Sequence, residues 1–249
     1  MSNLMMSEWY KLKRDRSFWT LILLLMMTSL FYPLLIVFDE GATTIKVIDF
    51  YRNTILEGNN YVIRLVPCIL AGFFISSEYS IGTMKSITAS GNSRAHIYFA
   101  KLIVYSIGAV LISLIFPLIF TGAVSVFLHF NGMPGIGYFA GTIGLTILYT
   151  IAFASMMALF ATIFTDSGKA IGFMLIFFII FDSILYLLGS LSPVFEIIYN
   201  YSVFKLFLDI GNIGTVHGAE MIQLVITPVV TFVAFGILGN YLFQKKEIK

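Results

Sequence analysis

The sequence predicts an all-α integral membrane protein, a single domain over residues 1–249 with six transmembrane helices. Hydrophobic residues make up 59% of the chain and charged residues only 11%, whereas an ordinary soluble domain carries about 25% charged residues. The apolar residues gather in six stretches near the length of about 20 helical residues that crosses a hydrocarbon core of about 30 Å. Lysine and arginine concentrate in alternate connections. A water-soluble enzyme of this composition could not cover its surface with polar groups, which argues against that class.

The six predicted spans differ in length. The second is the shortest and contains Pro67, while the third and fourth exceed what a bilayer requires and are expected to tilt or to extend past the lipid. The spans are residues 18–38, 61–77, 102–130, 138–164, 170–191 and 221–243.

The distribution of basic residues predicts that both ends of the chain lie in the cytoplasm. Eleven of the 15 lysine and arginine residues fall before the first span, after the second and fourth spans, or in the tail. This places the loop from Glu78 to Lys101 inside and the loop from Asp39 to Asn60 outside. Arg64 is expected near the outer end of the second span, where its side chain can snorkel to the headgroups.

The N-terminal segment predicts a short interfacial helix. Met5, Trp9 and Leu12 share one helical face, and four basic residues give the rest of the segment its charge. Such a helix lies in the inner headgroup layer, with Trp9 at the boundary. The alternative is that the basic residues act only as a topology signal.

The inner loop predicts a second amphipathic helix, from Glu78 to Thr88. Ile81, Met84 and Ile87 recur at helical spacing, and Gly91 is expected to end the helix before Asn92 or Ser93 caps the next one. A short cytoplasmic helix with an apolar stripe suits docking into a groove on another protein. It could equally lie in the interface without a partner.

Two further segments have an unusual polarity for their place. The stretch from Ser192 to Glu220 is too apolar for a solvated outer loop, so we expect it to lie in the interface or to dip into the membrane. Asp182 falls near the middle of the fifth span, where an ionised aspartate costs about 2.5–3.5 kcal/mol. It must be protonated, paired or facing water, either on a transport path or in a hydrogen bond to a residue such as Tyr149 or Ser155.

Motifs for chemistry are missing from the sequence. It contains no GxxxxGK[ST] motif for ATP, and Cys68 is its only cysteine. The three histidines are far apart, so we expect no catalytic residues, no bound cofactor and no metal site. An intramembrane lipid-modifying enzyme is an alternative that lacks its catalytic residues. A proton-coupled secondary transporter using Asp182 is another, although proton relays usually use several ionisable groups.

Two patterns resemble the permeases of ABC-2 type transporters. The inner loop is similar to theirs through Glu78-x-x-x-Gly82-Thr83, then Ser93-Arg94 and Lys101. The first segment is similar to their N-terminal elbow helix through Glu8, Lys11, Leu12, Arg14 and Trp19. The nearest resemblance is to small bacterial permeases that handle antimicrobial or cytolytic peptides, of the lantibiotic-immunity and phenol-soluble-modulin exporter types.

The resemblance implies a function and a set of partners. The chain would be the permease of an ATP-driven exporter of amphipathic peptides or other hydrophobic compounds, in a bacterial plasma membrane. ATP and Mg would bind to a separate dimeric ATPase, a second permease copy or a related permease would complete the transporter, and no nucleic acid is expected. The stretch between the fifth and sixth spans would form outer re-entrant helices. The coupling helix would contact the ATPase through Glu78, Ile81, Gly82, Thr83, Met84, Ile87 and Arg94.

Overall fold

The computed structural model describes residues 2–40 and 46–247, and all the regular elements in those ranges are helices. They are α1 (Ser2–Arg14), α2 (Arg16–Glu40), α3 (Val47–Phe50), η1 (Tyr51–Ile55), α4 (Leu56–Ala71), η2 (Gly72–Ser76), α5 (Ser77–Ile81), α6 (Thr83–Ala89), α7 (Arg94–Phe127), α8 (Ile136–Ile163), α9 (Ser167–Leu191), α10 (Pro193–Asn200), α11 (Val203–Leu208), η3 (Asp209–Asn212) and α12 (Ala219–Lys245).

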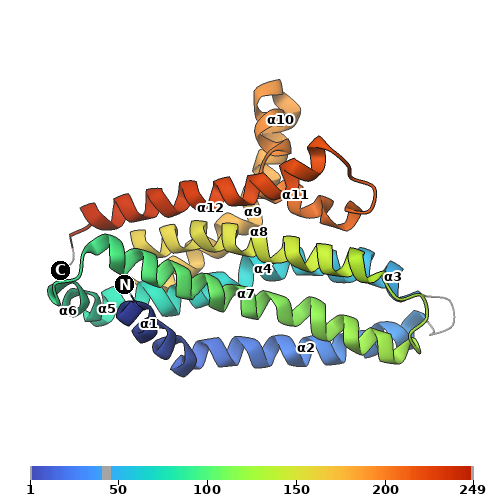
Figure 1. Cartoon of the computed structure of the whole chain (residues 1–249), viewed down its shortest axis with the longest axis horizontal. Coiled ribbons are helices and arrows are strands. Elements are labelled where there is room, and N and C mark those ends of the chain that lie inside the picture. Colours follow the sequence, from blue (N-terminus) through green and yellow to red (C-terminus); the bar gives the residue numbers. More distant parts are fainter. Residues whose placement is uncertain (1, 41–45, 248–249) are drawn as a thin grey trace.

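Six helical stretches in the described part of the chain are long and apolar enough to cross a membrane. They are Arg16–Leu35, Val47–Ile81, Arg94–Phe127, Ile136–Ile163, Ser167–Leu191 and Ala219–Lys245. The predicted all-α membrane fold with six spans is therefore confirmed. The long helices run side by side, and both ends of the chain lie at the end of the bundle that also holds α5 and α6 (Figure 1). We call this the basic end, because the lysine and arginine residues of α1 and of the segment from α6 to the start of α7 lie there.

The second span begins much earlier than the sequence suggested. Helix runs without a break from Val47 to Ile81, so the predicted outer loop is wrong from Val47 onward, while residues 41–45 lie outside the described residues. The polar residues of this stretch lower its hydropathy, but several of them face the bundle. Asn59 is fully buried and lies on the same side as Tyr51 and Ile55, which are also fully buried.

The predicted inner helix is also broken. Gly82 has φ of +80°, a conformation that glycine adopts at little cost, and it separates α5 from the seven-residue α6. Glu78 therefore belongs to the continuation of the second span. The expected stop and cap are both present, since Gly91 has φ of +82° and the Ser93 side chain accepts the backbone N–H of His96 at 3.3 Å. Because α7 starts at Arg94, Lys101 lies inside a helix.

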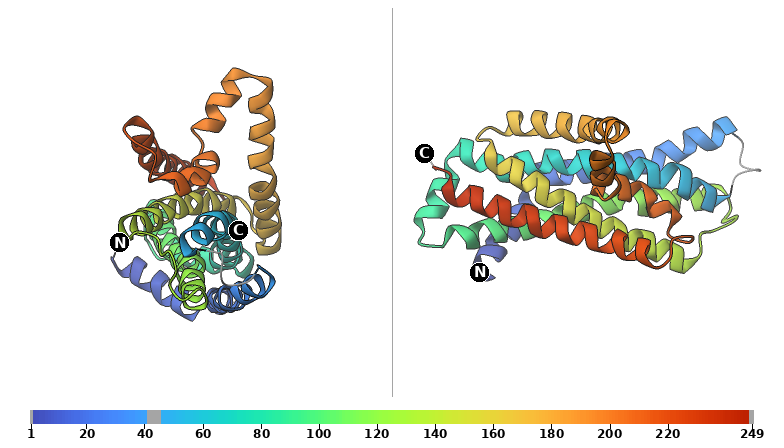
Figure 2. Two further views of the ribbon diagram at one scale, coloured as in Figure 1. Left: turned by 90° about the vertical axis from the view of Figure 1, so that its right-hand side faces the viewer. Right: turned by 90° about the horizontal axis from the view of Figure 1, so that it is seen from above.

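The segment after α9 divides into two different helices. Helix α11 buries Val203, Phe204, Leu206 and Phe207 and packs against α4, α8 and α12. Helix α10 buries no residue, and it stands away from the bundle together with the second half of α9 (Figure 2). The apolar character of this stretch thus has two sources: one helix is core and the other is exposed.

Candidate coupling site and intramembrane ion pair

The residues expected to contact an ATPase do not all face outward. Ile81 is 72% exposed beside the turn at Gly82, and Thr83, at the start of α6, is exposed as well. Met84 is only 1% exposed and packs in the protein's own core, with Ile87 partly buried against it. Met84 is therefore an anchor for α6, which corrects its expected role as a docking side chain. The apolar stripe of α6 faces the bundle, because that is where apolar surface is available.

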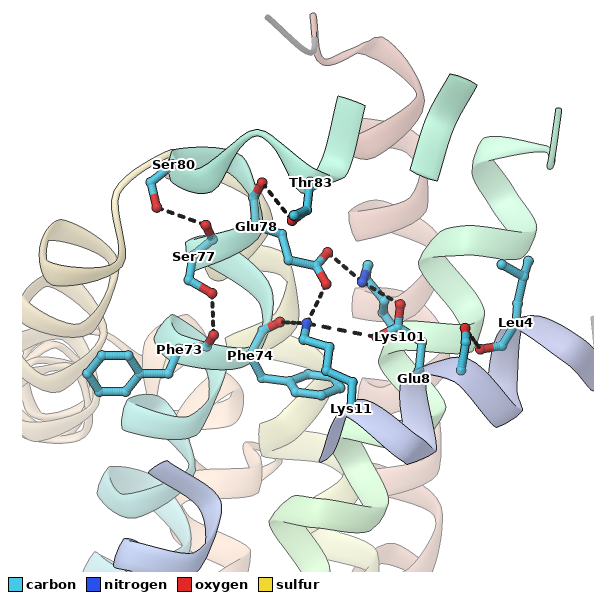
Figure 3. A network of polar contacts seen from close by, with 11 residues as sticks. Leu4, Glu8, Lys11, Phe73, Phe74, Ser77, Glu78, Ser80, Thr83 and Lys101 are labelled. Carbon is cyan, nitrogen blue, oxygen red and sulfur yellow. Dashed lines mark hydrogen bonds and ion pairs between the residues drawn. The ribbon is translucent and has the colours of Figure 1, made fainter. Parts of the chain in front are cut away.

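Four charged side chains from three elements meet directly behind this segment (Figure 3). Lys101 of α7 contacts Glu8 of α1 and Glu78 of α5, with Nζ–Oε distances of 2.5 Å in both cases. Lys11 of α1 binds the other oxygen of Glu78 and donates to the backbone oxygen of Phe74 at 2.6 Å. We call Glu8, Lys11, Glu78 and Lys101 the charge cluster.

The charge cluster is neutral and largely removed from water. The side chains of Lys101, Glu8 and Glu78 are between 4% and 6% exposed, and that of Lys11 is 32% exposed. Burying an ion costs several kcal/mol, which only close pairing and hydrogen bonds offset. Burial lowers the pKa of Lys11, and the positive charge of Lys101 lowers it further, while Glu78 and Glu8 oppose the change. The cluster therefore holds together only as a set of opposite charges.

Arg94 contacts this chain's own C-terminal residues. Its guanidinium donates to the backbone oxygens of Gln244 and Lys246, both at 2.8 Å. Lys246 in turn donates to the backbone oxygens of Thr162 and Ile163, at 2.5 and 3.1 Å, near the C-terminus of α8 where backbone oxygens lack helical partners. Burial lowers the pKa of Lys246 to about 8. Arg94 thus ties α7 to the end of α12.

A second ion pair lies within the membrane-spanning region. Arg64 of α4 donates to Asp182 of α9, with an Nη1–Oδ2 distance of 3.0 Å. The Arg64 side chain is 5% exposed and that of Asp182 is 20% exposed. Arg64 also donates from Nε to the backbone oxygen of Asn60 at 3.1 Å, and its guanidinium lies 5.8 Å from the centre of the Phe204 ring.

This pair corrects two expectations. Arg64 does not snorkel, because the helix starts at Val47 and the residue therefore lies in its middle. Asp182 is bound by an arginine and not by Tyr149 or Ser155. The sequence did not predict this pair, but it held a signal that could have identified it: one base and one acid, each alone in its predicted span. Two such charges in a membrane protein usually pair with one another.

Metal ligands are not grouped in the described part of the chain, where no three His, Cys, Asp or Glu side chains lie close enough to hold a metal ion.

A family model described as ABC-2 family transporter protein matches residues 4–183. No curated protein matches the chain. The matched residues include the whole charge cluster, α6, Arg64 and Asp182, and they make up more than half of the sequence. The chain is therefore a multi-pass membrane protein that belongs to the ABC-2 family of transporter proteins.

Proposed function

We propose that this chain is the permease subunit of an ATP-driven exporter, and that separate ATPase subunits bind ATP and Mg. Membership of the ABC-2 family supports this proposal, as does the sequence, which has no P-loop motif. The observation that carries it is the charge cluster, because it joins the exposed turn at Gly82 to α1 and α7. The positive-inside rule puts this end in the cytoplasm, where an ATPase would bind.

A conformational change of the ATPase would be transmitted to the permease at the turn at Gly82. Helix α5 continues the second span without a break, so a push on the turn acts along that span. Glu78 passes the same force to α7 through Lys101 and to α1 through Lys11. A buried set of close ion pairs is stiff, because separating the charges would leave each one uncompensated. The turn and the three elements would therefore move together.

Ile81 provides the sharpest test of this docking site. Burying an isoleucine side chain is worth about 1.5–3 kcal/mol, so we expect Ile81→Asp to weaken ATPase binding about 10- to 150-fold. Co-purification with a co-expressed candidate ABC-type ATPase, followed by titration, measures this. Ile136→Asp is the matched control, because Ile136 is 88% exposed at the opposite end of the bundle. Equal ATPase binding by the two variants would refute docking at this turn.

The orientation has its own test. Asn53 and Asn92 are both exposed and lie at opposite ends of the bundle. In a background without the native cysteine, we expect a membrane-impermeant maleimide to label Asn53→Cys in intact cells. Asn92→Cys should react only after permeabilisation. The reverse pattern would place the basic end outside and would contradict the docking proposal with it.

We place the transport path along the face that carries Arg64 and Asp182, with a second permease copy or a related permease completing it. Asp182 keeps some exposure, and a charged pair facing lipid would be costly. Helices α9 and α10 expose many apolar side chains that a second subunit would cover. A relay of protons would need further ionisable groups, and Asp182 is bound to Arg64.

Amphipathic membrane-active peptides are the proposed substrates. The resemblance of the inner loop to peptide-handling permeases supports this class, as does the aromatic surrounding of Arg64, whose guanidinium lies near the rings of Tyr61 and Phe204. Cells that express the permease with its ATPase should export such peptides or resist them. Unchanged sensitivity and secretion across a panel of cationic amphipathic peptides after deletion would count against this substrate class.

A further inference from the structure

A partly open pocket lies between α11, η3 and the start of α12, on the half of the bundle away from the basic end (Figure 1). Its volume is about 430 Å³, which is within the range of about 300–1,000 Å³ that is usual for ligand sites. The orientation proposed above puts this pocket, which we call the outer pocket, on the outer side of the membrane. It is separate from the charge cluster, whose residues do not line it.

The outer pocket carries a net negative charge. Its charged lining residues are Lys205, Asp209 and Glu220. Lys205 donates to both carboxylate oxygens of Asp209 at 2.7 Å, so these two charges offset one another. The Glu220 side chain, at the start of α12, has no ion-pair or hydrogen-bond partner within the part of the chain that the structure describes. A concave site with an uncompensated carboxylate attracts cations and disfavours anions.

The other walls of the outer pocket are fixed in place and partly apolar. The Gln223 side chain donates to the backbone oxygen of Asn200 at 3.2 Å, which joins α12 to the end of α10 and leaves the amide oxygen as an acceptor. Leu206 and Leu224 also line the pocket and are 6% and 2% exposed. An alkyl stem can pack against such side chains while its charged head reaches a carboxylate.

Helix α11 connects the outer pocket with the intramembrane ion pair. Lys205 and Leu206 of this helix line the pocket. The residue before them, Phe204, has its ring centre 5.8 Å from the guanidinium of Arg64. A ligand in the outer pocket would therefore lie one short helix away from the transport path proposed above.

We propose that the outer pocket binds the positively charged side chain of a transported peptide, with Glu220 as its counter-ion. Lysine is the best fit, because its alkyl stem matches Leu206 and Leu224. Its ammonium has three N–H donors and can bind Glu220 together with Gln223, a neighbour three residues along α12. The inference rests on the proposed function and names the group by which the permease recognises its substrates: a primary ammonium on an alkyl stem.

Charge-changing variants of partly or fully exposed residues test this site without disturbing the core. The probe is a fluorescent amphipathic peptide of lysine and leucine, titrated onto the permease in phosphatidylcholine nanodiscs, with binding to empty nanodiscs subtracted. We expect Glu220→Gln to raise the Kd about 2- to 5-fold, as for the loss of one ion pair near the surface. Lys205→Met frees Asp209 and should lower the Kd by a similar factor. Asp49→Asn is the matched control, because Asp49 is exposed in α3 and does not line the pocket.

The opposite signs of the two changes make the proposal easy to overturn. It falls if Glu220→Gln and Lys205→Met bind the peptide with the same Kd as Asp49→Asn, or if the wild type shows no saturable binding. No ATPase takes part in this assay, so such a result strikes the outer pocket alone. Unchanged sensitivity of cells after deletion of the permease would instead strike the proposed substrate class.

Two changes of the ligand identify the group that is bound. A peptide with acetylated lysines keeps the stems but loses the ammonium charge, so it should bind the wild type and Glu220→Gln equally, and a persisting difference overturns the proposal. Phosphatidylethanolamine carries the same ammonium on a shorter stem. If nanodiscs of this lipid weaken peptide binding to the wild type but not to Glu220→Gln, the outer pocket binds lipid headgroups and the peptide site is refuted.

Discussion

Replacing Lys101 with methionine tests the charge cluster most directly. Methionine keeps the length and much of the volume of lysine but removes its charge. Lys101 contacts both acids at 2.5 Å, so its loss leaves Glu8 and Glu78 to share Lys11. The cluster then carries one uncompensated negative charge in a place where the two carboxylate side chains are only 6% exposed.

The expected loss follows from this burial. Removing one partner of a buried ion pair costs about 3–5 kcal/mol, because the remaining charge stays buried without compensation. For a chain of 150–250 residues each kcal/mol lowers the Tm by about 2–4 °C. We therefore expect Lys101→Met to lower the Tm by about 6–20 °C.

The assay can use the single cysteine of the chain. Cys68 is fully buried, so a thiol-reactive fluorophore reports its exposure as the detergent-solubilised permease unfolds. Lys205→Met is the matched control, because Lys205 and Asp209 form an ion pair of 2.7 Å within one helical turn with about a third of each side chain exposed. Such a pair contributes about 0.3–0.5 kcal/mol, so its loss should lower the Tm by only about 1–2 °C.

A second substitution checks the physical cause. Adding Glu8→Gln to Lys101→Met removes the surplus charge and leaves Lys11 opposite Glu78, so much of the lost Tm should return. If Lys101→Met lowers the Tm no more than Lys205→Met, or if Glu8→Gln restores nothing, charge compensation is not what holds the cluster together.

Two further predictions concern the spans. Asp182→Asn should destabilise the permease, because Arg64 stays buried without its partner, and Arg64→Gln combined with Asp182→Asn should recover much of the Tm. Transport by this double variant then decides the role of the pair: loss of transport supports a place on the path, and normal transport leaves the pair a structural one. Gly239→Ala should destabilise the permease by about 1–3 kcal/mol and so lower its Tm by about 2–12 °C, because the new Cβ would lie 1.9 Å from the Tyr98 hydroxyl. Gly236→Ala is its control, since the nearest atom there is 3.5 Å away, and equal shifts for the two glycines would contradict the close approach of α12.

Local signals were sufficient for the six spans and for several of their ends. The spans were predicted from the lengths of apolar runs, and the cap of α7 from Ser93, and both features depend only on residues that are close in sequence. The same is true of the turn at Gly91, whereas the turn at Gly82, which breaks the predicted inner helix, was missed. Prediction of span ends from hydropathy failed where apolar and polar residues alternate. The start of the second span at Val47 was missed, because polar residues such as Asn59 and Asn60 lower the local hydropathy even though the bundle buries these two side chains.

The sequence by itself determined the class of molecule and the number of spans, and it singled out the charged residues that lie in or next to the spans. Only the tertiary structure decided which of these charges meet. Lys11 and Glu78 are 67 positions apart, Glu8 and Lys101 are 93 apart, and Arg64 and Asp182 are 118 apart. It also decided that Met84 faces inward while Ile81 faces out. The physical reason is that hydropathy adds up along the chain, whereas the cost of burying a charge is offset only by a partner brought close in space.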